Sequence, residues 1–115
     1  MAAIEIQKDS VDKVYEIIEN AKTTGKIVKG TNETTKAIER GKAKLVVVAK
    51  DVTPPEIIMH IPMIAEEKSA PCVIVPSKEE LGAAAGIQVP TGSVAVIEEG
   101  ESKGLIKQLL GRVSQ

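Results

Sequence analysis

The chain has 115 residues, 43% of them hydrophobic, and a formal net charge of −1, so we expect one folded domain over residues 1–115 rather than a disordered tail. No apolar run reaches the roughly 18 residues of a membrane span, and the first ten residues lack the pattern of a signal peptide. Cys72 is the sole cysteine, so an intrachain disulfide cannot form. We therefore expect a cytoplasmic protein. A single aromatic residue, Tyr15, without Phe or Trp, excludes the aromatic platforms on which single-stranded nucleic acids stack.

The N-terminal third predicts a helix followed by a short extended segment. Apolar residues recur at helical spacing over residues 11–21, behind two polar candidate caps, Asp9 and Ser10. Gly25 should end this helix, and residues 26–29 should be extended.

A second helix and a buried strand are predicted next. Thr31 or Asn32 can cap a helix that runs to about Arg40 and closes at Gly41. The β-branched run over residues 45–49 is typical of a strand that is covered on both faces.

The second half of the chain continues the alternation. Residues 53–56, Thr-Pro-Pro-Glu, and residues 77–80, Ser-Lys-Glu-Glu, are capping boxes, the first before a helix that contains Pro62 and the second before a helix that ends at Gly86. Strands are expected at residues 72–75 and 93–97, and a C-terminal helix at residues 105–113. Strands separated by helices predict an α/β layered domain with a mixed, largely parallel sheet.

Positive charge is concentrated between Lys22 and Lys44. Seven Lys or Arg residues there oppose two acids, which gives the window a net charge of +5 in a chain of net charge −1. Such segregation is typical of a surface that meets a polyanion. The predicted helix start at residues 30–32 adds unpaired N–H groups, a natural seat for a phosphate.

Three side chains in this window can also read base edges. Asn32 can donate and accept hydrogen bonds, whereas Glu33 can only accept and so favours an N–H-rich edge such as that of guanine. Lys36 lies one helical turn after Asn32 and can donate to a guanine oxygen. From the residues alone, an ordinary helix cap with a solvated charged face stays open as the alternative.

Other kinds of site are less well supported. Gly25 and Gly30 have the glycine spacing of a P-loop, but Thr31 stands where the lysine is needed. His60 has apolar neighbours, Cys72 lies in an apolar run, and Cys and His are too few for a structural zinc site. We therefore expect no enzyme activity, no catalytic residue, no metal and no cofactor.

The loop over residues 86–92 is unusually apolar for a surface connection. Ile87 and Val89 flank Gln88, and Pro90 stiffens the segment. It is either a hydrophobic lead-in to the last strand or an aliphatic edge that packs on exposed bases, which a chain without aromatic platforms would need.

A family resemblance is carried by three segments: KGTNETTKAIERGKAKLVVVAKDVTPPEI, PCVIVPSKEELG and GIQVPTGSVAVI. Together they resemble the archaeal ribosomal protein family that binds RNA kink-turns, the L-seven-Ae family, over nearly the whole chain and most closely over residues 11–97. The resemblance implies a three-layer α-β-α sandwich around a four-stranded sheet. It also implies recognition of a kink-turn, an internal loop with tandem sheared G·A pairs and an extruded nucleotide.

Members of that family are large-subunit ribosomal proteins, core proteins of box C/D and H/ACA guide particles, and components of RNase P. The resemblance therefore implies ribosomal RNA, guide RNA and RNase P RNA as partners, together with the protein partners of the guide particles, in ribosome biogenesis and tRNA processing. We expect a monomer when free and no membrane association. The alternatives are a protein-interaction scaffold of the same fold that lacks RNA binding and, more distantly, a small-molecule or nucleotide-binding α/β domain.

The resemblance also implies roles for individual residues. Asn32, Glu33 and Lys36 match residues that read the sheared guanines, and Gly30 and Thr31 match the turn that lets the helix start approach the RNA. Lys26, Lys29 and Arg40 match residues that contact the RNA backbone. Ile57 and Lys78 match residues beside the extruded base. The variable loop that touches the G·A face is matched by Ile87, Gln88, Val89 and Pro90.

Two positions depart from the family pattern. The family usually has an acidic residue where Lys50 stands, and Lys50 can instead add a phosphate contact. It often has an acidic residue near Thr53 as well, so the carboxylate that would hydrogen-bond the extruded nucleotide from position 53 is missing here. Lys42 and Lys44 are expected to be peripheral cations that strengthen binding to all RNAs about equally.

Overall fold

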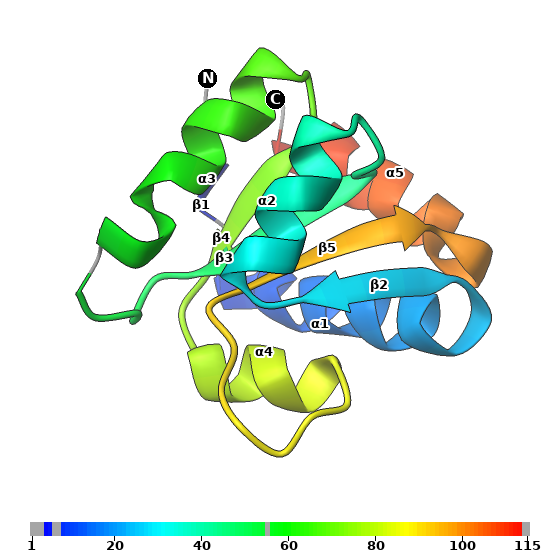
Figure 1. Cartoon of the computed structure of the whole chain (residues 1–115). Helices are drawn as coiled ribbons and strands as arrows, with labels where there is room; N and C mark the ends of the chain where they lie inside the picture. The colour runs from blue at the N-terminus through cyan, green and yellow to red at the C-terminus, as the bar shows by residue number, and fades with distance from the viewer. Residues whose placement is uncertain (1–3, 6–7, 55, 114–115) are drawn as a thin grey trace.

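Strands and helices alternate along nearly the whole chain in the computed structural model, which describes residues 4–5, 8–54 and 56–113 (Figure 1). The elements are β1 (Ile4–Glu5), α1 (Lys8–Thr24), β2 (Lys26–Lys29), α2 (Thr31–Glu39), β3 (Leu45–Ala49), α3 (Glu56–Glu67), β4 (Cys72–Val75), α4 (Lys78–Ala84), β5 (Ser93–Glu98), the 3-10 turn η1 (Gly100–Ser102) and α5 (Lys103–Val113). No helix in the described part of the chain combines the length and apolar character needed to cross a bilayer.

The strands form one mixed sheet in the order β1-β4-β3-β5-β2. Strands β2 to β5 are the four that the sequence predicts, and the two-residue β1 adds an edge strand that it did not. The pairings β1–β4 and β3–β4 are parallel, whereas β3–β5 and β2–β5 are antiparallel. The expectation of a largely parallel sheet is therefore corrected to an evenly mixed one.

The direction of β5 explains this difference. Strand β4 leaves the sheet at Val75, and after α4 the chain returns to the same edge, where Ser93 pairs with Val48 near the end of β3. A connection that returns to the edge it left must lead into an antiparallel strand. As a result, the carboxyl ends of β2, β3 and β4 and the start of β5 all meet at one edge of the sheet, which we call the carboxyl edge.

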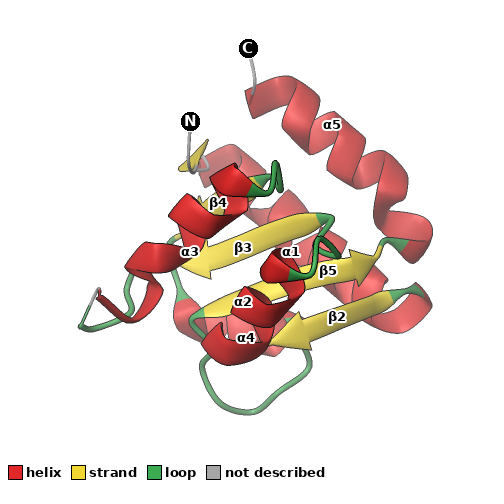
Figure 2. Ribbon diagram, turned by 45° about the horizontal axis from the view of Figure 1, so that its top comes forward, coloured by secondary structure: helices red, strands yellow, loops and turns green. Residues whose placement is uncertain are grey.

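Helices cover both faces of the sheet, which confirms the three-layer α-β-α sandwich (Figure 2). Helices α1, α4 and α5 share one core, in which Val14, Leu81 and Leu109 are fully buried. Helices α2 and α3 share the other, around Ile38 and Ile61. Strand β3 lies between the two cores and is buried at every position, as its β-branched run predicts.

Helix ends agree with the sequence signals at some positions and differ at others. Ser77 Oγ accepts a hydrogen bond from the Glu80 N–H at 3.1 Å, as the second capping box predicts. Asp9 and Ser10 lie inside α1 instead of capping it, because the helix already includes Lys8. The first capping box includes residue 55, which lies outside the described residues.

Candidate functional site

The start of α2 lies at the carboxyl edge, directly after β2. Gly30 is the residue that precedes the helix; its φ of 93° and ψ of 154° belong to a region that glycine alone adopts readily. The Thr34 N–H donates to the Gly30 carbonyl at 2.9 Å, and no side chain caps this helix. The prediction that Thr31 or Asn32 caps α2 is therefore wrong, since both residues lie inside its first turn.

This geometry leaves the predicted base-reading side chains directed to solvent. Thr34 and Ala37 are buried against the sheet, so the opposite side of α2 faces outward. Asn32 is exposed, and the side chains of Glu33 and Lys36 are 58% and 56% exposed, with 3.6 Å between the Glu33 carboxylate oxygen and Lys36 Nζ. The site thus presents a carboxylate and an ammonium group side by side, next to the free end of a helix.

The end of the 86–92 segment and the first residue of β5 lie beside this helix start. The Gly30 N–H donates to the Ser93 carbonyl at 2.9 Å, and Ser93 Oγ donates to Thr34 Oγ1 at 3.3 Å. A Cβ atom placed on Gly92 would lie 3.9 Å from Thr31 Oγ1. The two segments singled out in the sequence are therefore neighbours, although some 55 to 60 residues separate them along the chain.

Thr34 and Ser93 are site-forming residues that the sequence reasoning missed. Both are fully buried and polar, and they fasten α2 to the start of β5. A threonine on the apolar stripe of α2, three and four residues before Ala37 and Ile38, is the signal that could have identified the first of them.

The predicted variable loop is held against α4. The Ile87 N–H donates to the Gly82 carbonyl at 3.0 Å, and the Thr91 N–H donates to the Lys78 carbonyl at 3.1 Å. Ile87 is half-buried, Gln88 and Pro90 are exposed, and Val89 is 63% exposed. An aliphatic edge is thus available to a partner, which is what the functional interpretation of this loop requires.

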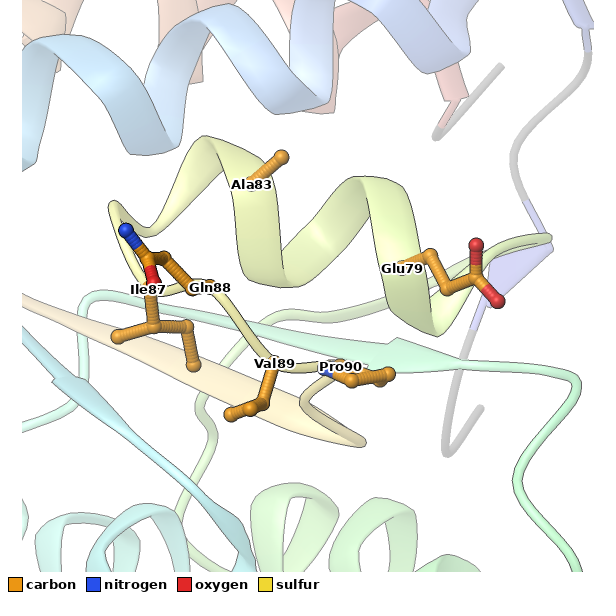
Figure 3. Close-up of a pocket in the computed structure, with 6 residues that line it drawn as sticks. All are labelled: Glu79, Ala83, Ile87, Gln88, Val89 and Pro90. Atoms are coloured by element: carbon orange, nitrogen blue, oxygen red, sulfur yellow. The ribbon is translucent and has the colours of Figure 1, made fainter.

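A hollow of about 500 Å³ lies beside the loop, lined by residues 87–90 and by Glu79 and Ala83 of α4. Figure 3 shows the side chains of Ile87 and Val89 pointing to the same side, away from α4. Both aliphatic side chains are therefore directed to the same side of the loop.

The residues predicted to hold an extruded base lie at the same edge, after β3 and β4. Lys78 is half-buried and opens α4, and its N–H donates to Asp51 Oδ1 at 2.8 Å. Asp51 is an acidic residue near Thr53, but its carboxylate already accepts this hydrogen bond from the start of α4. Lys50 and Thr53 are exposed, while the side chain of Ile57 lies outside the described residues.

The predicted backbone-contacting cations divide between the two ends of α2. Lys29 is exposed at the end of β2, beside Gly30. Lys26 and Arg40 instead border a hollow of about 110 Å³ further along α2, which Glu33 and Lys36 of the predicted base-reading set also line. The structure therefore brings Lys29 to the carboxyl edge and leaves Lys26 at the other end of β2.

Cys72 and His60, the two other side chains considered for reactivity, contact the core or a neighbouring helix. Cys72 is 3% exposed, and burial raises the pKa of its thiol to about 12, which confirms it as a small core residue. Thr35 Oγ1 lies 3.1 Å from His60 Nε2 and joins α2 to α3. Within the described residues, no three His, Cys, Asp or Glu side chains gather as a metal site would require.

Comparison with known proteins places these features in a family. A 15.5kD RNA binding protein from Giardia lamblia has a similar structure, with a TM-score of 0.89 and 29% sequence identity over 95% of this chain and 91% of that chain. The family model of the ribosomal protein L7Ae/L30e/S12e/Gadd45 family matches residues 12–106. Because this match spans most of the chain, the protein belongs to the ribosomal protein L7Ae/L30e/S12e/Gadd45 family.

Proposed function

We propose that this protein is a non-enzymatic RNA-binding protein that recognises kink-turns with tandem sheared G·A pairs and thereby nucleates a ribonucleoprotein. The observation that carries the proposal is the contact between the two halves of the site, the 2.9 Å hydrogen bond from the Gly30 N–H to the Ser93 carbonyl. It joins the start of α2 to the start of β5, which directly follows the loop over residues 86–92. Membership in a ribosomal protein family and the similarity to an RNA binding protein support the RNA part of the proposal.

Each part of the surface has a distinct role in this proposal. The first N–H groups of α2 and the positive end of its dipole attract an RNA phosphate. Asn32, Glu33 and Lys36 offer donors and acceptors to the edges of the sheared guanines. The exposed Val89 and the half-buried Ile87 cover the apolar face of the G·A pairs, so that shape and hydrogen bonding are read together.

The kink-turn is the feature that ribosomal, guide and RNase P RNAs would share as clients. We infer that one surface serves all three, as a large-subunit ribosomal protein and as a core component of box C/D, H/ACA and RNase P particles. Such a role needs specific hydrogen bonds to the G·A pairs, with charge neutralisation adding affinity and a strong salt dependence.

The decisive test compares a kink-turn RNA with a twin whose G·A pairs are disrupted. Glu33→Ala and Lys36→Ala should each weaken kink-turn binding by about 1–3 kcal/mol, the range for base-reading contacts. Thermal unfolding should change little, because an exposed ion pair contributes roughly 0–1 kcal/mol to stability. Glu39→Ala, the same change at an exposed position of the same helix, is the matched control and should bind normally.

The outcomes of this test separate the proposal from its rival. If the wild-type protein binds both RNAs equally well, or the Glu33 and Lys36 variants bind the kink-turn like wild type, base reading by this surface is refuted. The rival is a protein-interaction scaffold, which is favoured by one observation: Met59 and Met63, one turn apart on α3, are 60% and 65% exposed. Exposed large apolar side chains of this kind suit a protein partner, and under the scaffold function their replacement, and not that of Glu33, would abolish assembly.

A further inference from the structure

Thr35 and His60 join the two helices on one face of the sheet. Helices α2 and α3 lie on this face together and share the core cluster around Ile38 and Ile61 (Figure 2). Thr35 Oγ1 and His60 Nε2 lie 3.1 Å apart, within hydrogen-bond distance, and both residues are half-buried. This hydrogen bond crosses between the helix that carries the base-reading side chains and a helix that carries none of them.

Two neighbouring residues fasten α2 to two different elements. Thr34 Oγ1 accepts a hydrogen bond from Ser93 Oγ at the start of β5, and Thr35 meets His60 of α3. Successive residues of an α-helix point about 100° apart around its axis. One such hydrogen bond fixes a distance, whereas two in different directions also fix the rotation of the helix about its own axis.

The apolar contacts of α2 determine its rotation only weakly. The helix has nine residues and no side-chain cap, and its inner side is buried through Ala37 and Ile38. Hydrophobic contact is non-directional, whereas a hydrogen bond weakens steeply as its angle departs from a straight line. Aliphatic packing therefore sets how deeply α2 lies on the sheet, and the hydrogen bond between Thr35 and His60 sets how it is turned.

The base-reading side chains are sensitive to this rotation. Asn32 and Lys36 are exposed one helical turn apart, and Thr35 lies on the flank beside them, about 60° around the axis from Asn32. With its side chains an α-helix has a radius of about 5–6 Å, so a rotation of about 10° moves the outer atoms by roughly 1 Å. Hydrogen bonds to base edges need donor and acceptor about 2.7–3.2 Å apart, so a shift of this size weakens them.

We propose that His60 is a positioning residue for base recognition, because through Thr35 it sets the rotation of α2. That rotation aligns Asn32, Glu33 and Lys36 with the sheared G·A pairs. This role rests on the proposed function and adds a specificity determinant outside the residues that read the bases. A purely structural bond between two helices contributes to stability alone, whereas a positioning bond contributes to the difference in affinity between the right RNA and the wrong one.

The test measures the ratio of the affinities for a kink-turn RNA and its G·A-disrupted twin. One base-reading contact is worth roughly 5- to 150-fold in discrimination, so His60→Leu and Thr35→Val should each lower this ratio by at least about fivefold. His60→Gln should keep the ratio, because the glutamine amide also offers a donor and an acceptor. Met63→Leu places the same leucine at a 65% exposed position of the same helix; it is the matched control and should keep the ratio.

The double variant Thr35→Val/His60→Leu separates positioning from stability. Replacing both partners of a hydrogen bond by apolar groups of similar shape is nearly neutral or stabilising, so its Tm should equal or exceed that of wild type. Its affinity ratio should nevertheless be as low as that of His60→Leu, because both residues act through one bond. A wild-type ratio in the double variant, or a ratio for His60→Gln as low as that for His60→Leu, would overturn the assignment. A failure of the proposed function would appear separately, as wild-type protein that does not distinguish the two RNAs.

Discussion

Gly30→Ala isolates the contribution of one backbone conformation to the site. A Cβ atom at this position would meet nothing within 4 Å, so the substitution introduces no steric clash with other residues. The change acts through the dihedral angles alone, at φ 93° and ψ 154°. A residue with a side chain is held in this region at a cost of roughly 1–3 kcal/mol.

The expected loss of stability follows from this value and an opposing term. Alanine restricts the unfolded chain more than glycine does, which favours folding by about 0.4–1 kcal/mol. The free energy of unfolding should therefore fall by about 1–2 kcal/mol. For a domain of this size, about 4 °C in Tm corresponds to 1 kcal/mol, so Tm should fall by about 4–8 °C. If the helix start shifts to relieve the strain, the hydrogen bond from the Gly30 N–H to Ser93 weakens and the two halves of the site separate.

Thermal unfolding and RNA binding measured on the same samples test this reasoning. Gly104→Ala is the matched control, because a Cβ there also meets nothing within 4 Å but the residue lies inside α5, where alanine favours the helix by up to about 1 kcal/mol. Gly104→Ala should thus leave Tm unchanged or raise it. At 25 °C, where both variants are folded, Gly30→Ala alone should lose kink-turn affinity, by at least about tenfold. If Gly30→Ala melts at the wild-type temperature and binds normally, the glycine conformation has no role in the site.

Two more predictions concern the support of the site. Gly82→Ala places a Cβ against the Val89 carbonyl. It should destabilise the protein by about 1–3 kcal/mol and weaken kink-turn binding, although alanine is the better helix former. Thermal unfolding checks this against Gly111→Ala, whose Cβ meets nothing within 4 Å, and equal melting temperatures of the two variants would contradict it. Burial and then the charge of Glu80 raise the pKa of Tyr15 to about 12 from its ordinary value of 10.0. The unfolded chain therefore loses the phenolic proton first, and the stability of the folded state falls as pH rises above about 10. The absorbance of the tyrosinate form should show a midpoint near pH 12 in native protein and near pH 10 in denaturant. A native midpoint near pH 10 would refute the burial argument.

Local signals in the sequence predicted most of the secondary structure. The β-branched run at residues 45–49, the Ser77 capping box and the closing glycines Gly41 and Gly86 all depend on interactions within a few residues. Their outcome is therefore set before the chain folds. The cap of α2 was mispredicted because Thr31 and Asn32 are good capping residues, but the positive φ of Gly30 starts the helix one residue earlier.

Long-range pairing decided what the local signals left open. Alternating helices and strands are compatible with parallel or mixed sheets, and the direction of β5 depends on where the chain re-enters the sheet after α4. The two-residue β1 carries too few residues to produce a pattern. In the same way, Lys42 and Lys44 are equivalent in the sequence, but in the structure only Lys42 borders the hollow beside Lys26 and Arg40.

The sequence by itself determined the chemistry of this protein: a basic, Asn- and Glu-containing helix start, an aliphatic loop and a single aromatic residue. Tertiary structure alone decided that the helix start and the loop share one surface. That contact depends on the antiparallel pairing of β2 and β5, which brings Gly30 to the Ser93 carbonyl. Pairing between strands more than 60 residues apart is a property of the whole sheet and leaves no periodicity in either segment.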